Sequence, residues 1–394
     1  ALAMNPKTGE ILAMVSKPDF DPNNYQEYPK EIYNRNLPIW MSYEPGSTFK
    51  SVTFASALDL HLFDMFKDTY LDRGYEMVEG ARIKSWKAGG HGLQTFLQVL
   101  ENSSNPGFVE ISRRMGLENL YEYVMRFGFG TKTGVDMPGE SSGIMFAKHA
   151  MGPVEQATVA FGQGISVTPI QLVTAFSAII NGGILYKPYI TKSINDPITH
   201  DPIVEVKPTK QRRVISEETS KQMRYALESV VANGGGKPAY LEGYQIGGKT
   251  GTAQKAENGV YSHSNYILSF LSAAPMNDPQ IVLYVAADSP NNDILYGGTV
   301  IAPIVKACYE DILPYLGIEK VEKQIPKKLV WPETENIVLQ NFVGKRKEEV
   351  HQEGVTFTFV GDGDVVMEQL PAAGTSFSYE GGEAWIYLGN DNVH

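Results

Sequence analysis

The sequence contains very little cysteine and little basic charge. Cys308 is the one cysteine in 394 residues, which excludes an intrachain disulfide and a multi-cysteine metal site. The seven histidines include no pair at the H-x-x-x-H spacing of a metal-binding helix. The net charge is −11, and no basic cluster is longer than Gln211-Arg212-Arg213, which argues against a nucleic-acid partner. We therefore expect no metal, no cofactor and no nucleic acid.

Long hydrophobic runs are also missing. No apolar stretch approaches the ~18 residues of a membrane-spanning helix, and no signal peptide is present. The chain opens on Ala1-Leu2-Ala3-Met4, which resembles a strand already under way and has no initiator methionine. We expect a piece of a longer chain whose membrane anchor lies upstream of residue 1.

What is present is typical of a globular protein, with 42% hydrophobic and 20% charged residues. Strand-like patterns occur near both ends of the first 316 residues, and helical patterns occur between them. This order predicts an α+β fold in which one antiparallel sheet is built from both termini and flanked by helices. The expected strands are 2–4, 11–15, 244–254, 266–274 and 280–287, and the expected helices begin near 48, 92, 106, 169, 217 and 299.

The character of the chain changes after residue 316. Residues 317–334 are rich in lysine and glutamate and contain Pro326 and Pro332, as is typical of a polar linker. Residues 335–392 have strand patterns of their own at 355–360 and 384–388. We predict a first domain over 1–316, a linker over 317–334 and a small α+β domain over 335–392.

The most informative stretch is Glu44-Pro45-Gly46-Ser47-Thr48-Phe49-Lys50. Pro-Gly indicates a turn, and helical periodicity begins directly after it. Ser47 should therefore lie at the start of a helix, where backbone N–H groups are unpaired, with Lys50 one turn later on the same face. Taken alone, Ser47 could equally be a plain helix cap and Lys50 a solvated side chain.

Lys50 can take a proton from Ser47 only if its pKa falls from the usual ~10.4. Burial or a second cation would have that effect. A second element, Lys249-Thr250-Gly251-Thr252, lies on an expected strand. A third element, Ser103-Ser104-Asn105, follows one expected helix and precedes another.

These three elements together resemble the active site of the penicillin-binding proteins and serine β-lactamases. The blocks Asn5–Met14, Tyr43–Lys50 and Phe127–Gly130 resemble the class B penicillin-binding proteins, which are monofunctional transpeptidases. The tail, with Gln369-Leu370-Pro371-Ala372-Ala373-Gly374, resembles one PASTA domain. The segment 34–40 and the single tail unit are most similar to the sporulation-specific branch of the family, although division-specific members are close.

The resemblance implies a role for each motif residue. Ser47 would be the nucleophile on stem peptides that end in D-Ala-D-Ala, and Lys50 would be its base. Ser103 would relay a proton, and Asn105 would hold the substrate amide. Lys249 would favour a neutral Lys50 and attract the substrate carboxylate.

The remaining implied roles concern binding. Thr250 and Thr252 would bind the carboxylate, and Gly251 would permit close approach of the backbone. The backbone N–H groups of Ser47 and Thr252 would form the oxyanion hole. The implied protein is a penicillin-sensitive D,D-transpeptidase, held at the outer side of the bacterial cell membrane and working with a membrane glycan polymerase in spore-cortex or septal wall synthesis.

Two other functions remain open from the sequence. One is a hydrolase on the same scaffold, either a D,D-carboxypeptidase or a β-lactamase. The other is a non-catalytic penicillin-binding sensor or scaffold. Muropeptide binding by the tail is doubtful, because Val338-Leu339-Gln340-Asn341 departs from the usual start of a PASTA domain, and a spacer or docking role is the simpler interpretation.

Overall fold

The structure is a computed structural model that describes residues 1–257, 260–291, 296–327, 337–377 and 382–390. It divides into two compact units, residues 1–327 and 328–394. Each unit has a sheet and a hydrophobic core of its own.

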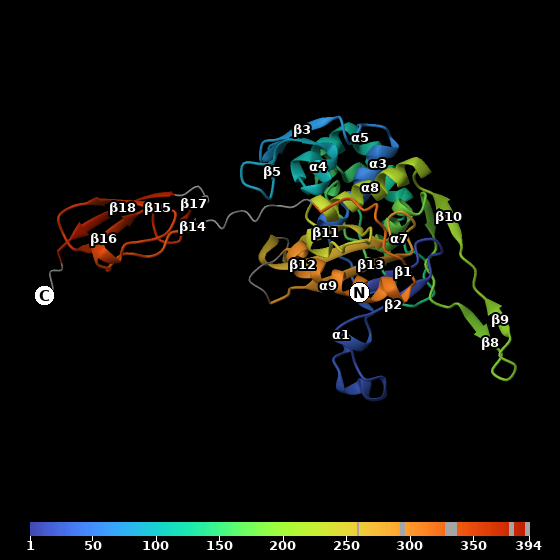
Figure 1. Cartoon of the computed structure of the whole chain (residues 1–394). Coiled ribbons are helices and arrows are strands. Elements are labelled where there is room, and N and C mark those ends of the chain that lie inside the picture. The colour runs from blue at the N-terminus through green and yellow to red at the C-terminus, as the bar shows by residue number, and fades with distance from the viewer. Residues whose placement is uncertain (258–259, 292–295, 328–336, 378–381, 391–394) are drawn as a thin grey trace. The chain divides into compact units, whose positions relative to one another are not determined.

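The first unit is organised around a five-stranded sheet in the order β11-β12-β13-β1-β2 (Figure 1). All neighbouring strands in this sheet are antiparallel. The two amino-terminal strands thus complete a sheet whose other three strands come from late in the unit, as the sequence predicted. The bounds are β1 Leu2–Met4, β2 Ile11–Met14, β11 Gly247–Glu257, β12 Val260–Ala274 and β13 Ile281–Asp288.

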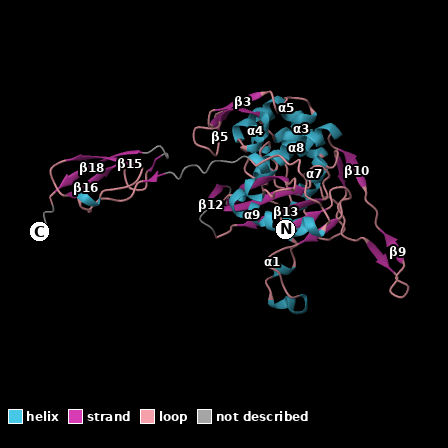
Figure 2. Cartoon of the chain, in the orientation of Figure 1, coloured by secondary structure: helices cyan, strands magenta, loops and turns pink. Residues whose placement is uncertain are grey.

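Both faces of this sheet are covered by helices (Figure 2). Along β12, Ile267 and Leu271 pack in the larger core beneath the central helices, whereas Leu268 and Phe270 pack against α9. This alternation follows from the period of two residues in a strand. The α-helices in the described residues are α1 Lys30–Tyr33, α2 Leu37–Trp40, α3 Lys50–Asp59, α4 Phe96–Glu101, α5 Asn105–Arg126, α6 Pro153–Val159, α7 Pro169–Ile180, α8 Glu217–Asn233 and α9 Gly297–Tyr315.

Several helix boundaries were predictable from local chemistry. Thr168 caps α7 by accepting the N–H of Gln171, and Pro169 occupies the first helical position. Ser216 caps α8 in the same way, and Glu217 and Glu218 lie in its first turn.

Other details differ from the sequence expectation. The segment 92–102 begins as strand β6 (Gly92–Thr95), and Thr95 then caps α4. No element was predicted for residues 17–46, but they contain a 3₁₀ helix, Pro22–Glu27, as well as α1 and α2. The peripheral strands are β3 Thr69–Asp72, β4 Tyr75–Val78, β5 Ala81–Lys84, β7 Ile184–Tyr186, β8 Ser193–Asn195, β9 Pro202–Glu205 and β10 Lys210–Arg213.

The predicted boundary at residue 316 needs correction, because the chain up to residue 327 belongs to the first unit. The side chain of Gln324 donates to the carbonyls of Leu241 and Tyr244, and Ile325 N–H donates to the buried Glu228 at 2.8 Å. The contacts described above are made by backbone and amide groups rather than by apolar side chains. The composition of this segment therefore gave no sign of them and indicated a linker. Residues 328–334 of the predicted linker lie outside the described residues.

The second unit contains a three-stranded sheet in the order β15-β18-β16 and a two-stranded pair, β14 with β17. The two predicted strands are confirmed as β15 Val355–Val360 and β18 Gly382–Gly389. Strand β16, Val365–Leu370, was not predicted. The two-stranded pair consists of β14 Ile337–Val338 and β17 Ser376–Phe377. The expected α component is wrong for the described tail, which has only a 3₁₀ turn, Lys347–Glu349. Gly344 and Gly354 both have positive φ, so too few residues remain between them for a stable helix.

Candidate active site

Ser47 lies in a 3₁₀ turn, Gly46–Thr48, that leads into α3. Gly46 has a φ of +53° and donates its N–H to the carbonyl of Gly162 at 3.0 Å. Thr48 donates its hydroxyl to the carbonyl of Pro45 at 2.8 Å. These bonds hold the serine turn from both sides, and Lys50, as the first residue of α3, lies behind it, as the sequence predicted.

Ser103 and Asn105 are held between two helices. Ser103 follows α4 with a φ of +54°, a conformation that is uncommon for a residue with a Cβ. Ser104 caps α5 by accepting the N–H of Gly107 at 3.1 Å, and Asn105 is the first residue of that helix. The strained backbone at Ser103 is therefore fixed by a helix end on each side, a pattern that recurs at functional sites.

The Ser103 hydroxyl is the shared contact of the site. It donates to Ser47 Oγ at 3.0 Å and accepts from Lys50 Nζ at 3.1 Å and from Lys249 Nζ at 2.9 Å. Lys50 also donates to Asn105 Oδ1 at 2.6 Å and to the Ser103 carbonyl at 2.8 Å. The structure therefore brings together five of the predicted residues in one hydrogen-bonded network, although Ser47 is linked to Lys50 through Ser103 rather than by a direct bond.

The two lysines have strongly altered acidity. Lys50 is 0% and Lys249 is 1% exposed. Burial, followed by repulsion from Lys249, holds the pKa of Lys50 well below its usual value. Burial lowers the pKa of Lys249 to about 7. Both of the effects that the sequence analysis named as able to lower the pKa of Lys50, burial and a second cation, are therefore present.

Strand β11 carries Lys249-Thr250-Gly251-Thr252 along the edge of the sheet beside the serine turn. A Cβ on Gly251 would lie 2.6 Å from Ser269 Oγ and 2.9 Å from Thr48 Cγ2. Only glycine lets β11 approach the turn this closely. Gly251 is thus a packing requirement of the site.

The two threonines project from the other side of β11. Thr252 Oγ1 accepts the N–H of Gly297, at the start of α9, at 3.1 Å. Because this bond occupies an acceptor position, the hydroxyl proton of Thr252 remains available to another partner. The backbone carbonyl of Thr250 accepts from Lys249 Nζ at 3.2 Å, and the side chain of Thr250 lies near Gly235 and Gly298.

A cavity of about 50 Å³ adjoins Ser47. Ser47, Asn105 and Thr252 line it together with Glu44, Gln163 and Gln254. Ser47 and Thr252, whose backbone N–H groups were expected to form the oxyanion hole, therefore face the same space.

Sequence reasoning assigned no role to the loop Phe161-Gly162-Gln163-Gly164 or to Glu44. Gly164 N–H donates to Glu44 Oε1 at 2.8 Å, and a Cβ on Gly162 would lie 2.2 Å from the Gly46 carbonyl. The signal that could have revealed the loop is its pair of glycines after a helical segment, since both have positive φ.

Lys-Thr-Gly also occurs at residues 7–9 and 132–134, where its residues have structural contacts. Gly9 closes the turn between β1 and β2 with a φ of +81°. Thr133 and Gly134 donate their backbone N–H groups to the carboxylate of Glu140. Neither copy contacts the network around Ser103 among the described residues.

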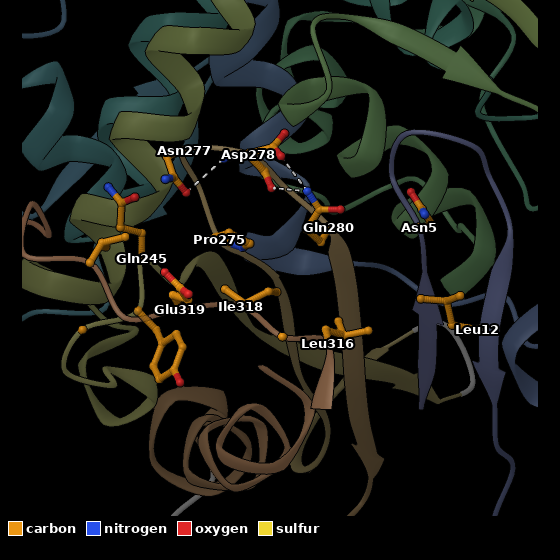
Figure 3. A pocket seen from close by; sticks show the side chains of 14 residues that line it. Asn5, Leu12, Gln245, Pro275, Asn277, Asp278, Gln280, Leu316, Ile318 and Glu319 are labelled. Carbon is orange, nitrogen blue, oxygen red and sulfur yellow. Dashed lines mark hydrogen bonds between the residues drawn. The ribbon is translucent and has the colours of Figure 1, made fainter. Parts of the chain in front are cut away.

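A larger cavity, of about 480 Å³, lies away from these motifs (Figure 3). It is bordered by Asn5 and Leu12 of the first hairpin, by the turn 275–280 between β12 and β13, and by the segment 316–319 after α9. Within the described ranges, no group of three or more His, Cys, Asp and Glu side chains could hold a metal ion, and no helix is long and apolar enough to cross a membrane.

Comparisons with known proteins agree with this geometry. Residues 1–310 match the family described as penicillin binding protein transpeptidase domain. The chain is 52% identical to stage V sporulation protein D of Bacillus subtilis over 98% of its length and 60% of that protein's. It is 32% identical to peptidoglycan D,D-transpeptidase FtsI of Escherichia coli K12 over 81% of its length and 52% of that protein's. The chain thus spans a little over half the length of these two curated relatives.

Solved structures give the same result for the first unit. The transpeptidase domain of Burkholderia pseudomallei penicillin-binding protein 3 has a TM-score of 0.69 and 32% identity over 81% of this chain and 88% of that one. Penicillin-binding protein 3 of Mycobacterium tuberculosis, solved with aztreonam, has a TM-score of 0.75 and 28% identity over 83% of this chain and 74% of that one. The family match covers most of the chain, and its fold is the one predicted for residues 1–316. The chain belongs to the penicillin-binding protein transpeptidase family.

Proposed function

We propose that this protein is a peptidoglycan D,D-transpeptidase that acts through an acyl-enzyme on Ser47. The observation that carries the proposal is the network in which Ser47, Ser103 and two buried lysines share hydrogen bonds. A lysine whose pKa is lowered by burial accepts a proton near neutral pH more readily than an ordinary lysine, which is already protonated there.

The first step is acylation. The hydroxyl protons first rotate, so that Ser47 donates to Ser103 and Ser103 donates to the uncharged Lys50. Lys50 then takes the Ser47 proton through the Ser103 hydroxyl, and Ser47 Oγ attacks the carbonyl of the penultimate D-Ala of a stem peptide. Backbone N–H groups of Ser47 and Thr252 stabilise the oxyanion, at ~3 kcal/mol for each donor. The C–N bond then breaks, and Ser103 passes a proton to the amine of the departing D-Ala.

Substrate orientation depends on β11 and α5. Lys249 and the hydroxyls of Thr250 and Thr252 bind the terminal carboxylate. The side-chain oxygen of Asn105 accepts from Lys50, which directs its NH₂ group to the substrate amide. An amine from a neighbouring stem peptide then attacks the ester, forms the cross-link and releases Ser47.

β-Lactams follow the same first step, because their strained amide presents a carbonyl to Ser47 and a carboxylate to Lys249. Similarity to stage V sporulation protein D supports a role in sporulation, and similarity to FtsI supports a role in wall synthesis. We extend the proposal to an extracytoplasmic location, an amino-terminal membrane anchor and a membrane glycan polymerase as partner. The second unit acts as a PASTA-type spacer or docking module.

The decisive experiment is the intact mass of the protein after incubation with benzylpenicillin, for the wild type and for Ser47→Ala. We expect one adduct per wild-type molecule that persists for hours and is absent from Ser47→Ala. Consumption of penicillin without an adduct would indicate a β-lactamase. If no adduct forms and no penicillin is consumed, a functional Ser47 is refuted. A second assay, D-Ala release with and without an amine acceptor, separates transfer from hydrolysis.

A further inference from the structure

Glu44 is a charged side chain that the proposed mechanism does not use. It precedes the nucleophile by three residues, is half-buried and lines the same cavity as Ser47. Its carboxylate accepts the N–H of Gly164 at 2.8 Å and the phenol of Tyr261 at 3.2 Å. Both bonds reach Oε1, and the second oxygen, Oε2, has no hydrogen-bond partner among the described residues.

The charge of Glu44 is not neutralised by a neighbour. Among the described residues that line the cavity, Glu44 is the one with a charged side chain, and none of the described ion pairs includes it. Burial raises its pKa, and its charge in turn helps to raise the pKa of Tyr261 to about 12, after the larger effect of burial. A partly buried carboxylate without a cation is costly, and a bound ammonium group would relieve that cost.

The position of Glu44 is nevertheless held firmly. Gly164 belongs to the loop whose Gly162 accepts the N–H of Gly46, and Tyr261 lies on β12. The carboxylate is thus fixed by the same loop that holds the serine turn. A carboxylate oriented in this way, with one oxygen unpaired, is suited to a charge-assisted bond with an ammonium donor.

We propose that Glu44 is the ammonium-binding subsite of this cleft and recognises the side-chain amine of a stem peptide. The inference rests on the proposed function for its substrate class. Two sources share this chemistry, because transpeptidation involves two stem peptides. The amine belongs either to the peptide that acylates Ser47 or to the peptide that accepts the acyl group.

The first test measures binding without chemistry. Ser47→Ala protein is titrated calorimetrically with a stem pentapeptide that ends in D-Ala-D-Ala and carries lysine at its third position, and with the Nε-acetylated form. If the donor amine is recognised, the free amine binds about tenfold or more tightly than the acetylated form, as expected for a charge-assisted bond. In the double variant Ser47→Ala/Glu44→Gln, this preference for the free amine should be lost.

The matched control is Glu122→Gln in the same background, because Glu122 is an exposed acid on α5. It should retain the full preference for the free amine. The thermal unfolding midpoint of each variant verifies its folding, and Glu44→Asp, which retains the charge, should keep part of the preference.

The second test addresses the acceptor. Protein with Ser47 intact is acylated by the Nε-acetylated stem pentapeptide as donor, and a peptide with a free side-chain amine is added as acceptor. If that amine is recognised, Glu44→Gln lowers the ratio of transfer to hydrolysis about tenfold or more relative to Glu122→Gln. No effect of Glu44→Gln in either test would overturn the inference. Failure of penicillin to acylate the wild type would instead refute the proposed function, while the calorimetric test of Glu44 would still stand.

Discussion

The repulsion between Lys50 and Lys249 can be tested by replacing Lys249 with methionine. Both ammonium nitrogens contact Ser103 Oγ, at 3.1 and 2.9 Å, so they lie no more than about 6 Å apart. At an effective dielectric constant of about 20, two like charges at that distance repel by roughly 3 kcal/mol. This repulsion favours the uncharged form of Lys50 and therefore lowers the pKa of Lys50, in addition to the larger effect of burial.

The assay is the second-order rate constant for acylation by benzylpenicillin as a function of pH. Acylation requires neutral Lys50, so the rate rises with pH as Lys50 loses its proton. Without the positive charge of Lys249, Lys50 holds its proton more tightly, and the midpoint of the acidic limb should move to higher pH. Lys249→Arg retains the charge and should keep the midpoint near that of the wild type.

The absolute rate will also fall in Lys249→Met, because Lys249 attracts the carboxylate of penicillin. The position of the midpoint is therefore the informative quantity. A midpoint that stays in place or moves to lower pH would refute the idea that Lys249 keeps Lys50 neutral. It would leave burial, the larger cause, as the whole reason for the lowered pKa of Lys50.

Three further perturbations have definite expected results. Gly251→Ala places a methyl group 2.9 Å from Thr48 Cγ2, so the serine turn must shift and penicillin acylation should slow by about tenfold to a hundredfold. Ser103→Ala removes the hydroxyl shared by Ser47 and both lysines, and acylation should fall by about a hundredfold or more with little change in thermal unfolding. A chain ending at 327 should take up penicillin normally, whereas a chain ending at 316 should unfold several degrees lower, because it loses the bond from Ile325 to buried Glu228.

Each of these expectations has a result that would contradict it. For Gly251→Ala, wild-type acylation kinetics would mean that β11 can move away from the serine turn at no cost. If acylation slows as expected, adding Ser269→Ala should partly restore the rate, because it opens space on the other side of the new methyl group. Unchanged acylation in Ser103→Ala would show that Lys50 reaches Ser47 without the relay. Equal unfolding temperatures for the two shortened chains would mean that residues 317–327 add nothing to the first unit.

The burial of the two lysines also has a consequence for stability. The pKa of Lys249 is about 7 in the folded protein but ~10.4 in an unfolded chain, so between these values the unfolded state binds more protons. The free energy of unfolding should therefore increase as the pH rises from about 7 to about 10, to the extent that Lys249 determines it. Lys249→Met should flatten this rise in urea titrations, and a rise that persists in full would assign it to other groups.

Local chemistry made much of the catalytic unit predictable. Thr168-Pro169 and Ser216-Glu217-Glu218 indicated the starts of α7 and α8, because caps and first-turn residues act within one turn. The period of two in 266–274 indicated a strand in a sheet. The error at residue 316 and the missed strand β16 have another cause, since the affected segments are stabilised by partners distant in the sequence.

The sequence by itself determined the three motifs, the order of the elements and the requirement that Lys50 be buried near a second cation. These follow from residue identity and short spacing. Only the tertiary structure decided that the Ser103 hydroxyl, 56 residues from Ser47, is the shared contact of the nucleophile and both lysines. It also decided that Glu44 faces the cavity, with no cationic side chain among the described residues that line it. Both results depend on how α4, α5 and β11 pack around the serine turn, and the distances created by packing are not encoded in the spacing of residues along the chain.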